Sequence, residues 1–102
     1  MRYREENNSV INKAIIDKEV VVGSNCFIGK GNDFSPNHDK PHLLNNGLNV
    51  IAKRARIPDS IKIERNCRIF SYVQKKDFKK KLISSGSTIF SKIKRNIDNE
   101  SS

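Results

Sequence analysis

The chain has 102 residues, the size of a single domain, and only 35% of them are apolar. Basic residues outnumber acidic residues by 20 to 11, which gives a formal net charge of +9 at pH 7. This composition excludes a membrane span, which needs about 20 consecutive apolar residues, and the charged first residues predict no signal peptide. Two cysteines are too few for a disulfide framework, so we expect a protein of the reducing cytoplasm.

After a polar lead-in of residues 1–8, the chain carries a repeat with a step of six residues, in two blocks. The aliphatic members of the two series are Val10, Ile16, Val22 and Ile28, then Ile51, Ile57, Ile63 and Ile69. Four positions after the first three members of each series comes a small or β-branched residue: Ala14, Val20 and Cys26, then Ala55, Ile61 and Cys67. Gly23 and Gly29 directly follow aliphatic members, where we expect tight turns.

The step of six predicts an all-β fold, a left-handed parallel β-helix of hexapeptide repeats with about three coils over residues 9–74. An α-helix would scatter these residues around its axis, because helical amphipathicity needs apolar residues three and four positions apart. In a β-helix, three short strands form one triangular coil, with the aliphatic residues inside its faces and the small residues near its corners. Cys26 and Cys67 then lie inside as packed thiols.

Residues 31–46 interrupt the repeat and are rich in Pro, Gly, Asn and Asp, so we predict a loop that leaves the coil. The loop holds His38 and His42 near two aspartates, and such residues can ligate zinc. Because Pro36 and Pro41 prevent a helix, the four-residue spacing does not place the histidines on one face. We expect an exposed polar loop without a metal ion.

Residues 75–102 form a basic C-terminal extension. Within it, residues 82–90 fit either a strand, turn and strand or the entry to a short helix. The apolar face of that helix would consist of Ile89, Phe90, Ile93 and Ile97. A lysine-rich segment with few aromatic residues is more typical of a solvated surface than of a nucleic-acid binder.

Two stretches of the repeat resemble the C-terminal β-helix of glucose-1-phosphate adenylyltransferases (ADP-glucose pyrophosphorylases). Residues 9–23, SVINKAIIDKEVVVG, are similar to the family pattern A-I-I-D-K-N, a spacer and I-G. Residues 47–59, GLNVIAKRARIPD, are similar to G-I-x-x-V-x-K-x-A-x-I-P. The two blocks come in the family's order with a polar loop between them, and the resemblance extends only loosely beyond residue 74.

The resemblance implies an enzyme context. Family members transfer an adenylyl group from ATP to glucose 1-phosphate, using magnesium, and the ADP-glucose formed serves glycogen or starch synthesis. That chemistry belongs to a nucleotidyltransferase domain preceding the β-helix. This chain has no glycine-rich phosphate loop of that kind, so we expect no catalytic residue, metal or cofactor in it. The implied role is oligomerisation and regulation.

The resemblance also implies an effector site. In plant-type members, the lysines of the two motifs bind anionic activators such as phosphoglycerate, and these motif positions fall on Lys18 and Lys53. Lysine suits a phosphate because it supplies hydrogen-bond donors and a mobile positive charge. Arg54 and Arg56 lie nearby but match no family motif. Alternatively, all four are solvated charges on the outside of the prism.

The expected partners are a second copy of the chain or a full-length adenylyltransferase subunit, with a phosphorylated sugar or acid as effector. Neither a membrane nor nucleic acid is expected. An open first coil would expose Val10, Ile11 and Ile15, which favours association. Two alternatives stay open: a small hexapeptide-repeat acyltransferase with His38 or His42 as base, and a binding module whose basic tail holds nucleic acid with salt-sensitive affinity.

Overall fold

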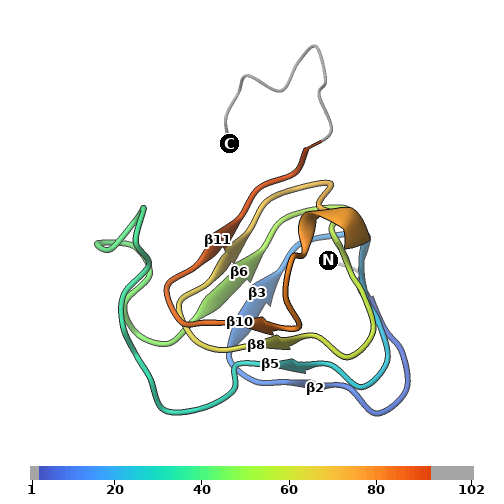
Figure 1. The fold of residues 1–102 in the computed structure, drawn as a ribbon, viewed down its shortest axis with the longest axis horizontal. Helices are drawn as coiled ribbons and strands as arrows, with labels where there is room; N and C mark the ends of the chain where they lie inside the picture. The colour runs from blue at the N-terminus through green and yellow to red at the C-terminus, as the bar shows by residue number, and fades with distance from the viewer. Residues whose placement is uncertain (1–2, 93–102) are drawn as a thin grey trace.

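A computed structural model describes residues 3–92 of the chain (Figure 1). Its elements are short strands and one 3-10 turn: β1 (Tyr3–Glu5), β2 (Val10–Ile11), β3 (Ala14–Ile16), β4 (Val20–Val22), β5 (Phe27–Ile28), β6 (Asn49–Ile51), β7 (Arg56–Ile57), β8 (Lys62–Ile63), β9 (Arg68–Ile69), η1 (Lys75–Asp77), β10 (Leu82–Ile83) and β11 (Thr88–Ile89). Over this range there is no helix with the length and apolar character that crossing a membrane requires.

The strands form three parallel sheets, which are the faces of a triangular prism (Figure 1). We call them sheet A (β1-β4-β7), sheet B (β10-β8-β5-β2) and sheet C (β11-β9-β6-β3). The chain passes through sheets A, B and C in turn, so each coil stacks on the previous one. Three coils are complete, and β10 and β11 belong to a fourth. The predicted parallel β-helix is therefore confirmed.

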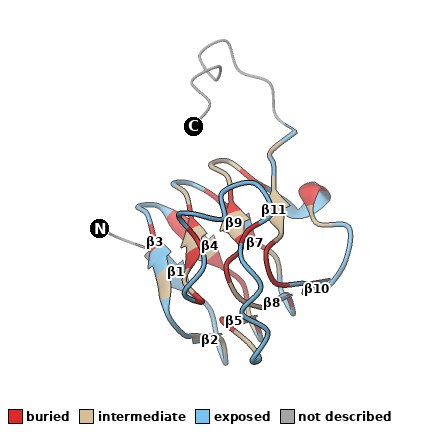
Figure 2. Ribbon diagram, turned by 90° about the vertical axis from the view of Figure 1, so that its left-hand side faces the viewer, coloured by how far each residue is buried: buried red, intermediate tan, exposed pale blue. Residues whose placement is uncertain are grey.

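The aliphatic residues of the repeat form columns inside the prism, where Figure 2 shows buried positions on successive strands. Residues in register in sheet B are Ile11, Ile28, Ile63 and Ile83. Those in register in sheet C are Ile16, Ile51, Ile69 and Ile89. Burying one such side chain contributes about 1.5–3 kcal/mol, so these columns are the main source of stability.

The predicted inward position at the start of the first series is wrong by one residue, because Ile11 and not Val10 occupies it. Val10 is 50% exposed and pairs with the half-buried Phe27, whereas Ile11 lies in register with the buried Ile28. The inward positions Ile11 and Ile16 are five residues apart, so the first coil turns this corner with one residue fewer than the repeat predicts. The other aliphatic members of both series are buried.

The corners of the prism are turned by residues with left-handed backbone conformation. Among residues 3–92, eight non-glycine residues have φ between 55° and 65°: Asn8, Lys13, Glu19, Asn25, Arg54, Ser60, Asn66 and Tyr72. From Lys13 onward they recur every six residues within each block and directly precede an interior small or β-branched residue. Positive φ is uncommon outside glycine, so the repeat carries a backbone requirement that the apolar pattern does not reveal.

The two glycines singled out from the sequence are needed for different reasons. Gly29 has a φ of +90°, as expected for a tight turn. Gly23 has no positive φ, but a Cβ atom there would lie 2.9 Å from the carbonyl oxygen of Ile57 and would overlap Asp59. Glycine at position 23 therefore permits close approach of the next coil rather than a special turn.

Both cysteines are packed thiols, as predicted. Cys26 and Cys67 are buried and form no disulfide. Burial raises the pKa of the Cys67 thiol to about 11, because the interior disfavours the thiolate. A thiol held protonated in this way is a poor nucleophile, so the geometry supports a structural role.

The predicted loop leaves the coil between β5 and β6 and is anchored back onto it by asparagine side chains. The buried Asn37 donates from Nδ2 to the carbonyl oxygen of Asn66 at 3.0 Å, and its Oδ1 accepts the N–H groups of Asp39 and Lys40 at 2.9 Å. Asn66 Oδ1 accepts the N–H of Gly47 at 2.7 Å. Buried polar groups that are satisfied in this way order the loop without a strand of its own.

The strands extend beyond the predicted β-helix of residues 9–74 on both sides. In the predicted lead-in, β1 pairs with β4 through its backbone, although it carries no aliphatic repeat residue. In the predicted extension, Ile83 and Ile89 continue the step of six, so the strand–turn–strand alternative is correct. The lysine-rich segment around η1 interrupts the repeat between β9 and β10, so the step of six is not continuous in the sequence. The alternative helix face included Ile93 and Ile97, which lie outside the described residues.

Candidate functional site

Lys18 and Lys53 lie one above the other at the corner between sheets C and A, and we call this site the lysine corner. The carbonyl oxygen of Lys18 accepts a hydrogen bond from the N–H of Arg54 at 3.1 Å, and that of Lys53 accepts one from Tyr72 at 3.2 Å. These bonds link consecutive coils, whose backbones are about 4.8 Å apart. The fold thus brings together two lysines that are far apart in sequence.

The same backbone turn presents both lysines. Each precedes a left-handed residue, Glu19 with φ 59° and Arg54 with φ 61°. Asp17 fixes the first turn by accepting the N–H of Lys18 on Oδ1 at 2.7 Å. Both lysines are exposed at the tips of these turns.

A cross-coil column of three side chains lies beside the two lysines. The guanidinium of Arg54 pairs with the carboxylate of Glu19 and donates from Nη1 to the hydroxyl of Tyr72 at 3.3 Å. The Glu19 carboxylate, followed by the Tyr72 hydroxyl, raises the pKa of Arg54. Arg54 therefore pairs with an acid beside the corner instead of standing free for a ligand.

Neither corner lysine has an ion pair among residues 3–92. Two exposed ammonium groups on neighbouring coils can approach two anionic groups of one ligand, or two oxygens of one phosphate. The equivalent position of the next coil is Ser71, so the positive charge is limited to two coils. Arg56 lies elsewhere, on β7, where it lines a hollow with Gln74 and Lys75.

The histidines of the loop form no metal or catalytic cluster in the described structure. His38 and His42 are exposed, and the N–H of His38 donates to the carbonyl oxygen of Gly86 at 2.9 Å. Residues 3–92 contain no group of three or more His, Cys, Asp or Glu that could hold a metal ion.

Glu19 and Tyr72 were not among the functional residues expected from the sequence. Tyr72 follows Arg54 by 18 residues, which is the length of one regular coil. The spacing of the repeat therefore predicts that these two residues lie on neighbouring coils. Glu19 and Arg54 are 35 residues apart because the loop lies between them, and no regular spacing reveals that pair.

Comparison with protein families decides which β-helix this is. The profile of the GLGC left-handed parallel beta-helix domain matches residues 5–62, more than half of the chain. This chain belongs to the GLGC left-handed β-helix family. The match includes Lys18, Lys53 and the whole loop between the two blocks of the repeat.

Two curated relatives of this GLGC β-helix are glucose-1-phosphate adenylyltransferases. The chain is 37% identical over 81 residues to the protein from Thermomicrobium roseum and 37% identical over 82 residues to that from Acetivibrio thermocellus. These alignments cover 79% and 80% of this chain but 19% of each relative. The chain thus spans about a fifth of the length of the curated relatives it matches. No solved structure matches it significantly.

Proposed function

We propose that this chain is a non-catalytic oligomerisation and regulatory β-helix of a glucose-1-phosphate adenylyltransferase. The observation that carries the proposal is the stacking of Lys18 and Lys53 on consecutive coils of a GLGC β-helix. The names of the two relatives support the enzyme context.

In this proposal, catalysis belongs to the nucleotidyltransferase domain of the assembled enzyme. That domain would transfer the adenylyl group of ATP to glucose 1-phosphate with magnesium, releasing pyrophosphate and supplying ADP-glucose for glycogen or starch in the cytoplasm. The β-helix would supply subunit contacts and respond to effectors.

A phosphorylated acid is the effector class that suits the lysine corner. Its carboxylate and phosphate groups carry two separate negative charges, and the two lysine ammonium groups supply two cations one coil apart. Repulsion from Glu19 is small because Arg54 pairs with that carboxylate. The corner can therefore bind an anion through two charge-assisted contacts.

The first coil offers a surface for subunit contact. The edge strands β1, β2 and β3 all lie at this end of the sheets. Ile15 is 54% exposed and lines an apolar hollow with Leu43, which is 74% exposed, and with Val50. Exposed apolar surface next to open strand edges is typical of an interaction site.

Calorimetric titration of the full chain with phosphoglycerate tests the effector site. We expect the double variant Lys18→Gln/Lys53→Gln to bind about tenfold or more weakly, since two charge-assisted contacts are lost. The matched control is Lys30→Gln/Lys40→Gln, which removes the same charge elsewhere and should bind as the unmodified chain does. Equal weakening in both double variants would contradict a site at the corner.

A further inference from the structure

A groove opens where the chain leaves the regular coil after β9. In the fourth coil, the segment around η1 replaces the strand of sheet A, so β7 has β4 as its only strand partner in that sheet. The groove has a volume of about 610 Å³, within the usual range of about 300–1,000 Å³ for small-molecule sites. Its lining residues are Pro58, Ile61, Gln74, Lys75, Lys76, Phe78, Lys79, Lys80 and Lys81, and we call it the lysine groove.

The acids beside this groove accept backbone N–H groups and form no ion pair with its five lysines within the described residues. Asp77 is buried, and its two carboxylate oxygens accept the N–H groups of Gln74 at 2.8 Å and of Lys92 at 3.1 Å. Asp59, which lines the adjoining hollow with Arg56, accepts the N–H of Ser24 at 2.8 Å. Among residues 3–92, no ion pair involves a lysine of the groove.

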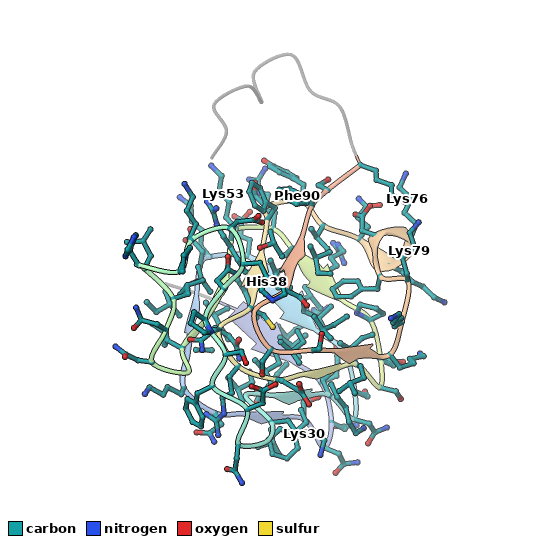
Figure 3. All side chains as sticks on the ribbon, turned by 60° about the vertical axis from the view of Figure 1, so that its left-hand side comes forward. Lys30, His38, Lys53, Lys76, Lys79 and Phe90 are labelled. Carbon is teal, nitrogen blue, oxygen red and sulfur yellow. The ribbon has the colours of Figure 1, made fainter. Side chains whose placement is uncertain are left out.

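Positive charges crowd one another at this site. The pKa of Lys92 is lowered, chiefly because its ammonium group lies beside that of Lys79. Figure 3 shows Lys76 and Lys79 on the side of the molecule that carries η1, away from Lys30 at the bottom of the view. An anion bound among these lysines would relieve their mutual repulsion.

The groove also has an apolar floor, which the lysine corner lacks. Pro58 and Phe78 are half-buried, and Ile61 is fully buried beneath them. The sequence suggested a solvated lysine run because aromatic residues are few, but the fold places the Phe78 ring among the lysines. An apolar surface next to several cations suits a ligand that combines a planar ring with phosphate groups.

We propose that the lysine groove binds a nucleotide, with the base on the floor formed by Pro58 and Phe78 and the phosphates among the lysines. The nucleotide is either free or part of a single-stranded nucleic acid, since both present the same base and phosphate chemistry. An anion without a base uses the lysines but gains nothing from the floor, and an acidic protein segment lacks the phosphates. This inference is independent of the effector site at the lysine corner.

Fluorescence anisotropy of the full chain with two probes tests the proposal. The probes are ATP carrying a fluorescent group on the ribose and a short fluorescein-labelled oligothymidylate. We expect Lys75→Gln/Lys79→Gln to weaken binding about tenfold and to lower the slope of log affinity against log salt by roughly 1 per lysine. The control Lys30→Gln/Lys40→Gln, which removes the same charge outside the groove, should leave the affinity for both probes unchanged.

Competition experiments then separate the possible ligands. If unlabelled ATP displaces bound nucleotide better than inorganic triphosphate does, the base contributes as proposed. Tighter binding of the oligothymidylate than of ATP identifies a strand as the ligand, and the reverse order identifies a free nucleotide. Equal displacement by ATP and triphosphate, failure of both probes to bind, or equal weakening by the groove and control variants would overturn the proposal. None of these results depends on whether phosphoglycerate binds at the lysine corner.

Discussion

The lysine corner and the lysine groove are both basic, but they are built in opposite ways. The corner lies within the regular repeat, where Glu19, Arg54 and Tyr72 form a column across three coils beside the two lysines. The groove lies where the repeat breaks, and Asp77 of η1 holds the backbone of that segment by accepting two N–H groups. The regular repeat thus pairs opposite charges between coils, whereas the lysines at its break form no ion pair among residues 3–92.

The two sites should also differ in what they bind. The corner offers two cations on an exposed surface, which suits a small ligand with two anionic groups. The groove offers more cations above an apolar floor, which suits a nucleotide. Measurements of stability, pH dependence and ligand binding on single variants test this contrast.

The largest effect should come from the interior that supports both sites. Ile63→Ala empties a fully buried position between coils, and we expect a loss of about 2–5 kcal/mol in the free energy of unfolding, measured with urea. The matched variant Ile83→Ala lies in the last coil with a strand on only one side, so its loss should be smaller. A larger loss for Ile83→Ala would show that the fourth coil, not the regular stack, dominates stability.

A second effect concerns pH and the packed thiol in that interior. The pKa of Cys67 is raised from 9.0 to about 11, so the unfolded chain loses this proton at lower pH than the folded chain does. The resulting contribution to the free energy of unfolding is about 2–3 kcal/mol. It is fully present below pH 9 and is lost as the pH rises through about 11. The free energy of unfolding, measured at several pH values across this range, should fall less with pH for Cys67→Ala than for the unmodified chain. If the free energy of unfolding depended on pH equally in both proteins, the thiol would not be held protonated by burial.

Asp77→Ala should affect the groove without affecting the corner. Removing a buried carboxylate that accepts two backbone N–H groups should cost about 1–3 kcal/mol. The groove lysines then lose their fixed backbone, so nucleotide binding should weaken while phosphoglycerate binding stays the same. The exposed Asp39 provides the control as Asp39→Ala. Loss of phosphoglycerate binding in Asp77→Ala would show that the two sites are coupled.

The smallest change should come from the column beside the corner. Glu19→Gln removes an exposed ion pair, and we expect a small loss in the free energy of unfolding that decreases at high salt. Because Arg54 is released, phosphoglycerate should bind a few-fold more tightly. Glu6→Gln breaks the other described ion pair, with Arg4, and should not change phosphoglycerate binding. Weaker binding in Glu19→Gln would contradict an anion site at the corner.

The step of six could be predicted from sequence because burial in this fold repeats strictly along each sheet. What the sequence could not reveal depends on backbone contacts and on breaks in the repeat. The step of five between Ile11 and Ile16 shifted the expected register at Val10, and β1 is held by pairing with β4 rather than by a buried aliphatic residue. The loop anchor at Asn37 involves long-range contacts that follow no period.

The candidate site was predictable in part, for a related reason. The positions of Lys18 and Lys53 came from motifs, and the coil geometry explains why they meet. The groove was not predicted, because part of its floor comes from a different coil than its lysines do. Pro58 follows β7, while Phe78 and the lysines follow the break after β9. Only the fold shows that they face the same space.

The most direct test of the account is assembly with a full-length glucose-1-phosphate adenylyltransferase from the same cells. The two purified chains would be mixed and the mass of the complex measured by light scattering during size-exclusion chromatography. We predict a stable complex that Ile15→Asp disrupts, since that position is exposed on the first coil. Leu82→Asp, at a similarly exposed position on the last coil, should leave it intact. Failure of the unmodified chain to bind the enzyme would contradict its proposed role.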